Sequence, residues 1–520
     1  MTNESAVITT HHDLPRLRRW AGYIALCVGM FMAILDIQVV VTSLKTIEEA
    51  LNIGADRMSW VQTSYLIAEV IAIPIIGLLM RVFGMKRLFV GALGLFTLAS
   101  IGCALSIGFW DLMVWRVIQG FAGGVLIPLV FSAIFLLFPR SFEQTLATTA
   151  GGFLAVLAPT MGPVTGGWLT EHYSWHWLFL INVVPGLVAV IAGLIALPPG
   201  RFNRGLIRTL DWMSLLAFGV SLALLIVGLK EAPSRGWLSP VVMTLFAGSL
   251  ATLAYSVMRK DAAIMFHLLK DRALSFGCIL SFLLGFILFS SVYILPVFFA
   301  FVRGMTPLEI GLITIAMGVM QIVAAPFTVL LDRYFDARVL TAAGFIVFAA
   351  GLLMNANLTV SSGEPDVFWA QIMRGAAVAL CILPPIRMAL ALQPIAVVSD
   401  ASGLFNVVRN IGGAIGIAIM DTVMFTRGPS HADLLMDRIA TNPPAAAAQL
   451  GIPLDTLPSP DDAMSIMGIM DLIQNASLTE AINDCWWLLA ALSLMALPVL
   501  WLLGPVESAR PLKGRYTSRD

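Results

Sequence analysis

The sequence predicts an all-α polytopic membrane protein, built as two six-helix halves with two extra helices between them. Three observations lead to this prediction. First, 59% of the 520 residues are hydrophobic and 12% are charged, whereas a soluble domain carries about 25% charged residues. Second, the mean hydropathy is +0.89, because apolar stretches recur along almost the whole chain. Third, motifs of the first half recur in the second, as expected for a fold built from internal repeats.

Fourteen apolar stretches are long enough to cross a bilayer. The hydrocarbon core is about 30 Å thick, and a helix needs about 20 residues to cross it. The stretches cover residues 20–43, 59–80, 87–107, 110–138, 145–168, 177–197, 211–229, 239–258, 274–302, 309–330, 339–357, 367–392, 401–426 and 486–503. We expect 14 transmembrane helices, two sets of six with the seventh and eighth inserted between them.

Basic residues predict the side of the membrane on which each loop lies, because Lys and Arg are retained on the cytoplasmic side. The N-terminus, every second loop and the C-terminal tail hold 20 Lys and Arg residues, and the opposite loops hold 7. We therefore expect a multi-pass protein of the cell inner membrane with both termini in the cytoplasm. The predicted parts are the cytoplasmic N-terminus 1–19, the first half 20–197, the inserted helices 211–258, the second half 274–503 and the cytoplasmic tail 504–520.

One predicted external loop, residues 427–484, is far longer than the usual connection between helices. It contains two consecutive prolines, a run of alanines, and apolar residues at helical spacing over 461–479. We expect it to be partly helical and to lie outside the lipid. The sequence leaves two interpretations open, a solvated connector and a docking surface for another protein.

Two motifs recur in the two halves. The fourth stretch reads WRVIQG over residues 115–120 and reaches Pro128, and the twelfth reads IMRG over 372–375 and reaches Pro384. Basic turns follow the second and the tenth stretches. Their notable residues are Gly77, Gly84, Lys86 and Arg87 in the first half and Asp332 and Arg333 in the second.

Ionisable residues inside the apolar stretches are the main candidates for function, because a charge at membrane depth costs several kcal/mol unless it is paired or hydrated. Asp36, Glu69 and Arg116 lie at similar depths in the first, second and fourth stretches. We expect them to form one polar cluster that binds a proton. A purely structural hydrogen bond is the alternative role for each carboxylate.

The second half adds further candidates at membrane depth, Arg374, Arg409 and Asp421. Arg374 lies at about the depth of Arg116. Asp421 is close enough to the outer surface to be solvated. We expect Arg387, near the inner end of its stretch, to extend to the lipid headgroups.

The fifth stretch combines glycines and prolines at close spacing. These residues are Pro159, Gly162, Pro163, Gly166 and Gly167. Glycine allows close approach of another helix, and proline removes a backbone hydrogen bond. We expect a closely packed or bent segment, and ordinary small-residue packing is the alternative.

Several classes of function find no support in the sequence. The net charge is zero, with 31 basic and 31 acidic residues, so nucleic acid is not an expected partner. The five cysteines are isolated from one another, and neither a metal site nor a disulfide framework is expected. No GxxxxGK[ST] segment occurs, so ATP is not expected to drive the protein directly. No catalytic constellation is visible, and we expect no enzyme.

With these motifs, nearly the whole chain resembles the major facilitator superfamily. Within it, the chain resembles the fourteen-helix drug:proton antiporters, which include multidrug exporters that work with a periplasmic adaptor. The segments that carry the resemblance are RVIQG and LIP at 116–128, APTMGPVTGG at 158–167, YSWHW with the following Ile181 and Asn182, and the element at 474–484. The chain departs from the family pattern at Arg81, where an Asp is expected, and at Lys45, where a Pro is usual.

The resemblance implies the major facilitator fold and proton-coupled export of hydrophobic or amphipathic drugs by alternating access. The proton gradient then takes the place of a cofactor, the fifth stretch carries the antiporter motif, and the basic turns form gating loops. The implied partners are membrane lipid, a small hydrophobic substrate, a periplasmic adaptor and an outer-membrane channel. A dedicated exporter of one metabolite, lipid or siderophore is the alternative, and a membrane receptor or membrane-embedded enzyme is a remote one.

Overall fold

The computed structural model describes residues 14–58, 60–138, 142–200, 202–203, 205, 211–259, 266–390, 393, 395–458 and 463–503. These residues form helices and no strands. The predicted tail 504–520 and most of the predicted N-terminus 1–19 lie outside them, as do several of the basic loop residues on which the orientation depends.

The first half consists of six helical rods, some of them interrupted. Their elements are α1 (Arg16–Val41), α2 (Leu44–Leu51), α3 (Ala55–Met58), α4 (Trp60–Ala72), η1 (Ile73–Ile75), α5 (Ile76–Phe83), α6 (Met85–Ala104), α7 (Phe109–Leu137), α8 (Phe142–His172), α9 (Trp177–Leu180) and α10 (Val183–Ala196). The inserted pair is α12 (Trp212–Arg235) and α13 (Pro240–Met258).

The second half repeats this plan and adds a segment outside the bundle. Its elements are η2 (Phe266–Lys270), α14 (Arg272–Val297), η3 (Phe298–Val302), α15 (Pro307–Leu331), α16 (Ala337–Met354), α17 (Glu364–Leu390), α18 (Ile395–Thr441), α19 (Pro443–Leu450), η4 (Leu454–Thr456), α20 (Ala463–Gly468), α21 (Met470–Leu494) and α22 (Ala496–Leu503).

The predicted fold class is confirmed. Among the described residues, 12 helices are long and apolar enough to cross a membrane, and α4 with α5 makes a thirteenth if this bent pair is one span. Helix α8, with 31 residues, covers the fifth predicted stretch. Each of the fourteen stretches therefore has a helix over it.

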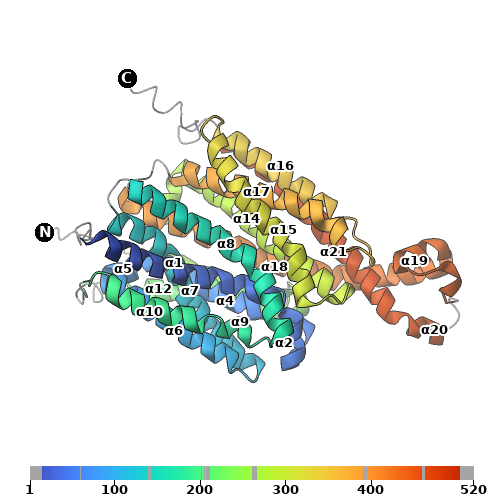
Figure 1. Ribbon diagram of the computed structural model, residues 1–520. Helices are drawn as coiled ribbons and strands as arrows, with labels where there is room; N and C mark the ends of the chain where they lie inside the picture. Colours follow the sequence, from blue (N-terminus) through green and yellow to red (C-terminus); the bar gives the residue numbers. More distant parts are fainter. Residues whose placement is uncertain are drawn as a thin grey trace.

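The long loop 427–484 is largely helical in its described residues. Helix α18 continues to Thr441 and α21 begins at Met470, so both extend well beyond the apolar stretches that hydropathy identified. Their outer turns pack with α19 and α20 around a small, separate apolar core, and this packing stabilises them outside the lipid. The core consists of Leu435, Ile439, Ala446, Leu450, Ile466, Ile473 and Ala476. Figure 1 shows α19 and α20 at the far end of the bundle from α5. We call residues 427–484 the extension.

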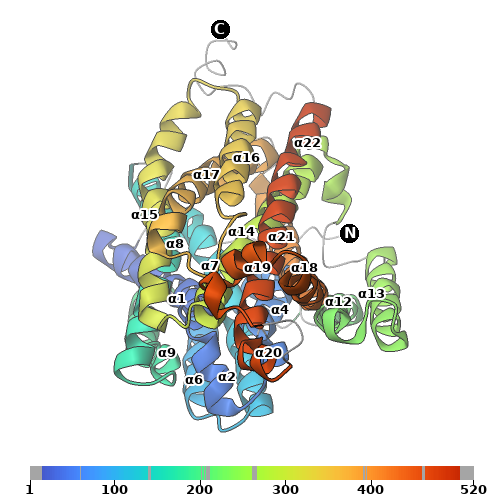
Figure 2. The same ribbon diagram turned by 90° about the vertical axis from the view of Figure 1, so that its right-hand side faces the viewer.

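The halves meet along two seams. In one, α8 of the first half packs against α15 of the second; in the other, α4 packs against α18. The inserted helix α12 covers the second seam, since its Phe218 and Leu222 pack with Val70 of α4 and Val407 of α18. Figure 2 shows α12 beside α18, with α13 outermost.

Candidate functional site

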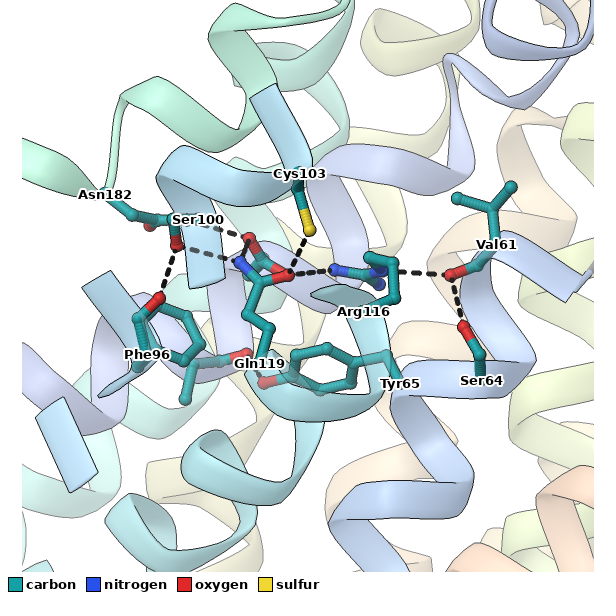
Figure 3. A network of polar contacts seen from close by, with 11 residues as sticks. Val61, Ser64, Tyr65, Phe96, Ser100, Cys103, Arg116, Gln119 and Asn182 are labelled. Carbon is teal, nitrogen blue, oxygen red and sulfur yellow. Dashed lines mark hydrogen bonds and ion pairs between the residues drawn. The ribbon is translucent and has the colours of Figure 1, made fainter. Parts of the chain in front are cut away.

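A polar network lies inside the first half, with Asp36 of α1 at its centre. Arg116 of α7 donates from Nη1 to Asp36 Oδ2 at 2.5 Å and to Gln119 Oε1 at 2.8 Å. Gln119 and Asn182 donate to the other carboxylate oxygen, Oδ1, at 2.9 and 2.7 Å. Figure 3 shows Gln119 between Arg116 and Asn182. Both oxygens of Asp36 are therefore hydrogen-bonded, and one of them carries the charge-assisted bond.

The network is closed to solvent. Asp36 is 1% exposed, and Arg116 and Gln119 are 0% exposed. Arg116 also donates from Nε to the carbonyl oxygen of Val61 at 3.0 Å, and its guanidinium lies 4.5 Å from the ring centroid of Tyr65. Removing one partner of such a buried pair leaves an uncompensated charge, which typically costs about 3–5 kcal/mol.

Sequence reasoning identified Asp36 and Arg116 but assigned no role to Gln119 or Asn182. Both lie in segments that carry the family resemblance, so the signal was present as motif letters. Their role depends on tertiary contact, because Asn182 is 146 residues from Asp36 along the chain.

Glycines of the fourth-span motif bring α7 against α4. A Cβ at Gly120 would lie 2.2 Å from the carbonyl oxygen of Tyr65, and one at Gly124 would lie 2.7 Å from that of Glu69. Any side chain at these positions would force the helices apart. The motif therefore combines the ionisable Arg116 with the close packing that encloses it.

Glu69 lies apart from the Asp36 network, so the expected single cluster is divided into two. Its Oε1 accepts from Asn410 of α18 at 3.5 Å, and its carboxylate interacts electrostatically with Arg409. Both partners belong to the second half. The sequence predicted the burial of Glu69 and missed Asn410.

The glycines and prolines of the antiporter motif lie in the middle of α8, between α1 and α15. A Cβ at Gly162 would lie 2.4 Å from Cβ of Gln38, and one at Gly166 would lie 2.2 Å from the carbonyl oxygen of Val39. Pro159 and Pro163 are accommodated inside the helix. This face of α8 therefore packs on α1 backbone to backbone.

The opposite face of α8 meets the second half in the same way. A Cβ at Gly167 would lie 2.3 Å from the carbonyl oxygen of Pro307, and a Cβ at Gly311 of α15 would lie 2.5 Å from the carbonyl oxygen of Pro163. A Cβ at Gly318 would lie 2.6 Å from the side-chain Oγ1 of Thr160. At Gly167 and Gly311 the α8–α15 seam is thus formed by backbone surfaces.

The second half also contains a hydrogen-bonded Arg and Gln in its fourth rod, but their order along the helix is the reverse of that of Arg116 and Gln119. Gly120 and Gly375 occupy equivalent places, because each would bring a Cβ 2.2 Å from a carbonyl oxygen of the second rod of its half, Tyr65 and Met317 respectively. Arg374 therefore corresponds to Gln119 and Gln371 to Arg116. Arg374 donates from Nη1 to Gln371 Oε1 at 2.6 Å.

Arg374 is enclosed without a carboxylate. It is 1% exposed, and its guanidinium lies 5.2 Å from the ring centroid of Trp486 in α21. Helix α14, which corresponds to α1, contains no Asp or Glu, and in the described part of the chain no acidic side chain forms an ion pair with Arg374. An aromatic face and an amide therefore hold this cation.

Asp421 anchors the inserted helices. Lys230 of α12 lies 2.6 Å from Asp421 Oδ2, and Tyr293 of α14 donates to Oδ1 at 2.8 Å. Asp421 is half-buried, so it keeps some access to solvent while side chains of two other helices bind its carboxylate. Lys230 lies one residue beyond the predicted stretch 211–229, but it is buried in α12, because pairing with Asp421 compensates its charge.

The gating-loop residues lie at the end of the bundle opposite the extension. Gly84, at φ +73°, separates α5 from α6, Gly77 lies within α5, Lys86 is half-buried and Arg87 is exposed. In the second half, Asp332 pairs with Arg387 of α17, with Nη2 2.8 Å from Oδ1, and Arg333 is exposed. The expectation that Arg387 extends to the headgroups is wrong, because a carboxylate of its own half binds it.

The described residues include no group of three or more His, Cys, Asp or Glu side chains able to hold a metal ion. The arrangement instead provides buried carboxylates that a proton could neutralise, each beside an arginine. Such groups at membrane depth are typical of ion and proton pathways.

Residues 26–417 match the family described as Major Facilitator Superfamily. The chain is 35% identical over 415 residues to the colistin resistance protein EmrB of Acinetobacter baumannii, which covers 78% of this chain and 80% of that protein. It is 27% identical over 492 residues to the multidrug export protein EmrB of Escherichia coli K12, covering 93% and 94% of the two chains.

A third relative, the fatty acid resistance protein FarB of Neisseria gonorrhoeae, is 26% identical over 508 residues and covers 95% of this chain and 98% of its own length. Among solved structures, a bacterial homologue of the human lysosomal transporter Spinster, inward-facing and occupied, superposes with a TM-score of 0.60 at 12% identity. It covers 94% of this chain and 97% of its own, and this likeness concerns the fold.

Proposed function

Because this chain belongs to the major facilitator superfamily and is therefore a transporter, we propose that it is a proton-coupled antiporter that exports hydrophobic or amphipathic toxic compounds. The observation that carries the proposal is the burial of two carboxylates, Asp36 and Glu69, beside arginines inside membrane-spanning helices. A proton that neutralises either group changes an electrostatic contact at membrane depth, where such contacts are strong. The proton gradient supplies the energy, and no cofactor or catalytic step is needed.

Alternating access requires halves that move relative to each other. The α8–α15 seam suits this requirement, because a Cβ at Gly167 or at Gly311 would meet the backbone of the other half. Small residues at a helix interface in a membrane let the two backbones approach closely. We therefore propose that residues of the antiporter motif form the surface along which the two halves move relative to each other.

The substrate class rests on the relatives, which are named for multidrug export, colistin resistance and fatty acid resistance. The compounds in these names indicate amphipathic or hydrophobic substrates. Export of one lipid-like compound is the second candidate, and the relative named for fatty acid resistance favours it. A panel of lipophilic drugs and long-chain fatty acids separates a broad exporter from a dedicated one.

We further propose that the protein lies in the cell inner membrane with both termini in the cytoplasm, which places the extension on the periplasmic side. The extension has its own apolar core and exposed apolar side chains, among them Leu434, Leu454 and Met467. Such side chains suit a protein partner. A periplasmic adaptor that leads to an outer-membrane channel is the proposed partner.

The test of the function uses everted membrane vesicles with an imposed pH gradient. Fluorescent lipophilic drugs are expected to accumulate inside the vesicles when the lumen is acidic and to leave when the gradient is collapsed. Vesicles without the protein are the control. Drug accumulation that requires ATP and does not change with the pH gradient would contradict the proposal.

A further inference from the structure

The α4–α18 seam differs from the α8–α15 seam because charged and polar side chains lie within it. Glu69 of α4 faces Asn410 and Arg409 of α18. Apolar contacts flank these residues on both sides along the seam, with Ile67 and Ala414 in one cluster and Val70 and Val407 in the next. A single carboxylate of the first half thus accepts a hydrogen bond from Asn410 of the second half and interacts electrostatically with Arg409, at the surface where the halves must separate.

The hydrogen bonding of Glu69 is incomplete. The bond from Asn410 to Oε1 is 3.5 Å long, and Oε2 is buried without a hydrogen-bond partner among the residues that the structure describes. Glu69 itself is 5% exposed. Burial favours the neutral acid, and the charge of Arg409 and the single bond from Asn410 oppose it. The charge on Glu69 therefore depends on few partners.

Asp36 provides the opposite case. It accepts three hydrogen bonds, from Arg116, Gln119 and Asn182. All three partners and Asp36 belong to the first half, so adding a proton there would leave Arg116 buried and unmatched without changing a contact between the halves. Neutralising Glu69 would instead change a contact between the halves, because Asn410 and Arg409 belong to α18 of the second half.

No other described charge replaces that of Glu69 within the seam. Helix α7 presents the backbone of Gly124 to it, and α12 covers the seam with apolar Leu222 and Ile226. Tyr65, one turn away on α4, is the neighbouring titratable group and donates to the carbonyl oxygen of Ala33.

The nearest charged side chain of α12 in the seam region, Lys230, is paired with Asp421. The electrostatic attraction between α4 and α18 therefore depends on the ionisation of one side chain, while the apolar contacts of the seam do not change with pH.

We propose that Glu69 is the proton-binding residue that controls separation of the halves along the α4–α18 seam. In its ionised form Glu69 attracts Arg409 and Asn410 and holds α4 against α18. Proton binding neutralises the carboxylate, removes this attraction and allows the seam to open, and loss of the proton restores it. Asp36 then has a structural role in the first half. This inference rests on the proposed proton coupling and names the residue that performs it.

The experiment measures the separation of the halves directly by double electron–electron resonance. Spin labels are attached to full-length protein in lipid nanodiscs through cysteines at exposed positions on opposite halves. Arg57→Cys with Phe425→Cys reports one end of the bundle, and Arg81→Cys with Phe335→Cys reports the other. The five native cysteines are buried, and labelled protein without introduced cysteines provides the background.

The distance distributions are expected to change between alkaline and acidic pH in otherwise unaltered protein. Glu69→Gln should give the acidic distribution at every pH, because the amide keeps the shape of the side chain without its charge. Glu69→Asp should retain the pH response, and this charge-conserving variant covers the case in which Glu69→Gln fails to fold. Glu231→Gln makes the same chemical change in α12 outside the seam and should leave the response unchanged.

A pH response that persists in Glu69→Gln, or distributions that ignore pH in the unaltered protein, would overturn the inference. Failure of the proposed function looks different. If vesicles show no proton-driven drug transport while Glu69→Gln still abolishes the pH response, the control of the seam by Glu69 stands and drug:proton exchange does not.

Discussion

Arg374 occupies in the second half the place that Gln119 occupies in the first. The glycine that follows each residue packs against the second helical rod of its own half, which fixes the correspondence. Both halves contain an Arg–Gln hydrogen bond, but the order of the two residues along the helix is reversed. The first half matches its arginine with Asp36, whereas the second encloses Arg374 with Trp486. The two halves therefore share an Arg–Gln pair but differ in the group that compensates the charge of the arginine.

This relationship predicts that Trp486 stabilises the second half. Trp486→Leu removes the aromatic face beside the Arg374 guanidinium, and a desolvated cation–π contact is worth about 2 kcal/mol. The variant should have a lower melting temperature in detergent. Trp487→Leu is the matched control, because the neighbouring Trp487 is exposed and should be replaceable without this loss. Equal melting temperatures for the two variants would show that Arg374 is stabilised elsewhere.

Asp36→Asn should destabilise the first half and reduce transport together. Arg116 would then be buried without a carboxylate, which typically costs about 3–5 kcal/mol. The double variant Asp36→Asn with Arg116→Gln should recover part of the lost melting temperature, since it removes the unmatched charge. Thermal unfolding, monitored by light scattering, measures the melting temperatures of the single and the double variant. Asp36→Asn with unaltered stability and lost proton coupling would instead make Asp36 the proton carrier.

Arg116→Lys should impair transport even though the charge is kept. The guanidinium serves Asp36, Gln119 and Val61 at once, and the ammonium of lysine cannot reproduce its planar arrangement of donors. Drug accumulation in vesicles at equal amounts of inserted protein measures the effect. Normal accumulation would indicate that transport does not require the planar arrangement of donors on the Arg116 guanidinium.

Gly167→Ala should slow transport by holding the halves apart. The added Cβ would lie 2.3 Å from the carbonyl oxygen of Pro307, so α8 and α15 must separate. Gly152→Ala lies in the same helix with no atom within 4 Å of the added Cβ and should transport normally. Transport rates of the two variants in vesicles make the comparison. Similar rates would mean that the α8–α15 seam opens without close glycine contact.

Leu454→Glu with Met467→Glu tests the extension as a docking surface. Both side chains are exposed, so the folded transporter should keep its melting temperature and its transport in isolated vesicles. Co-purification of a periplasmic adaptor and cellular drug resistance should decrease. Unchanged resistance together with an unchanged adaptor complex would contradict the docking proposal and favour a connector without a partner.

The sequence by itself determined the fold class and the membrane-spanning stretches, because lipid demands long apolar helices and hydropathy measures that demand directly. It also identified Asp36, Arg116 and the glycines of α8, since charges and repeated small residues are rare enough at membrane depth to attract notice. The extent of α18 and α21 was missed, because their outer turns are stabilised by a local core such as Leu435 with Ile473 and not by lipid.

Only the tertiary structure decided which charges meet. Asp36 and Glu69 lie at similar depths, but depth does not specify the direction in which a side chain points around its helix. The fold turns Asp36 toward Arg116 inside the first half and Glu69 toward Asn410 of the second. It likewise pairs Asp421 with Lys230 and Arg387 with Asp332. These pairings depend on how the rods rotate and pack, and that is fixed by contacts between residues far apart in the chain.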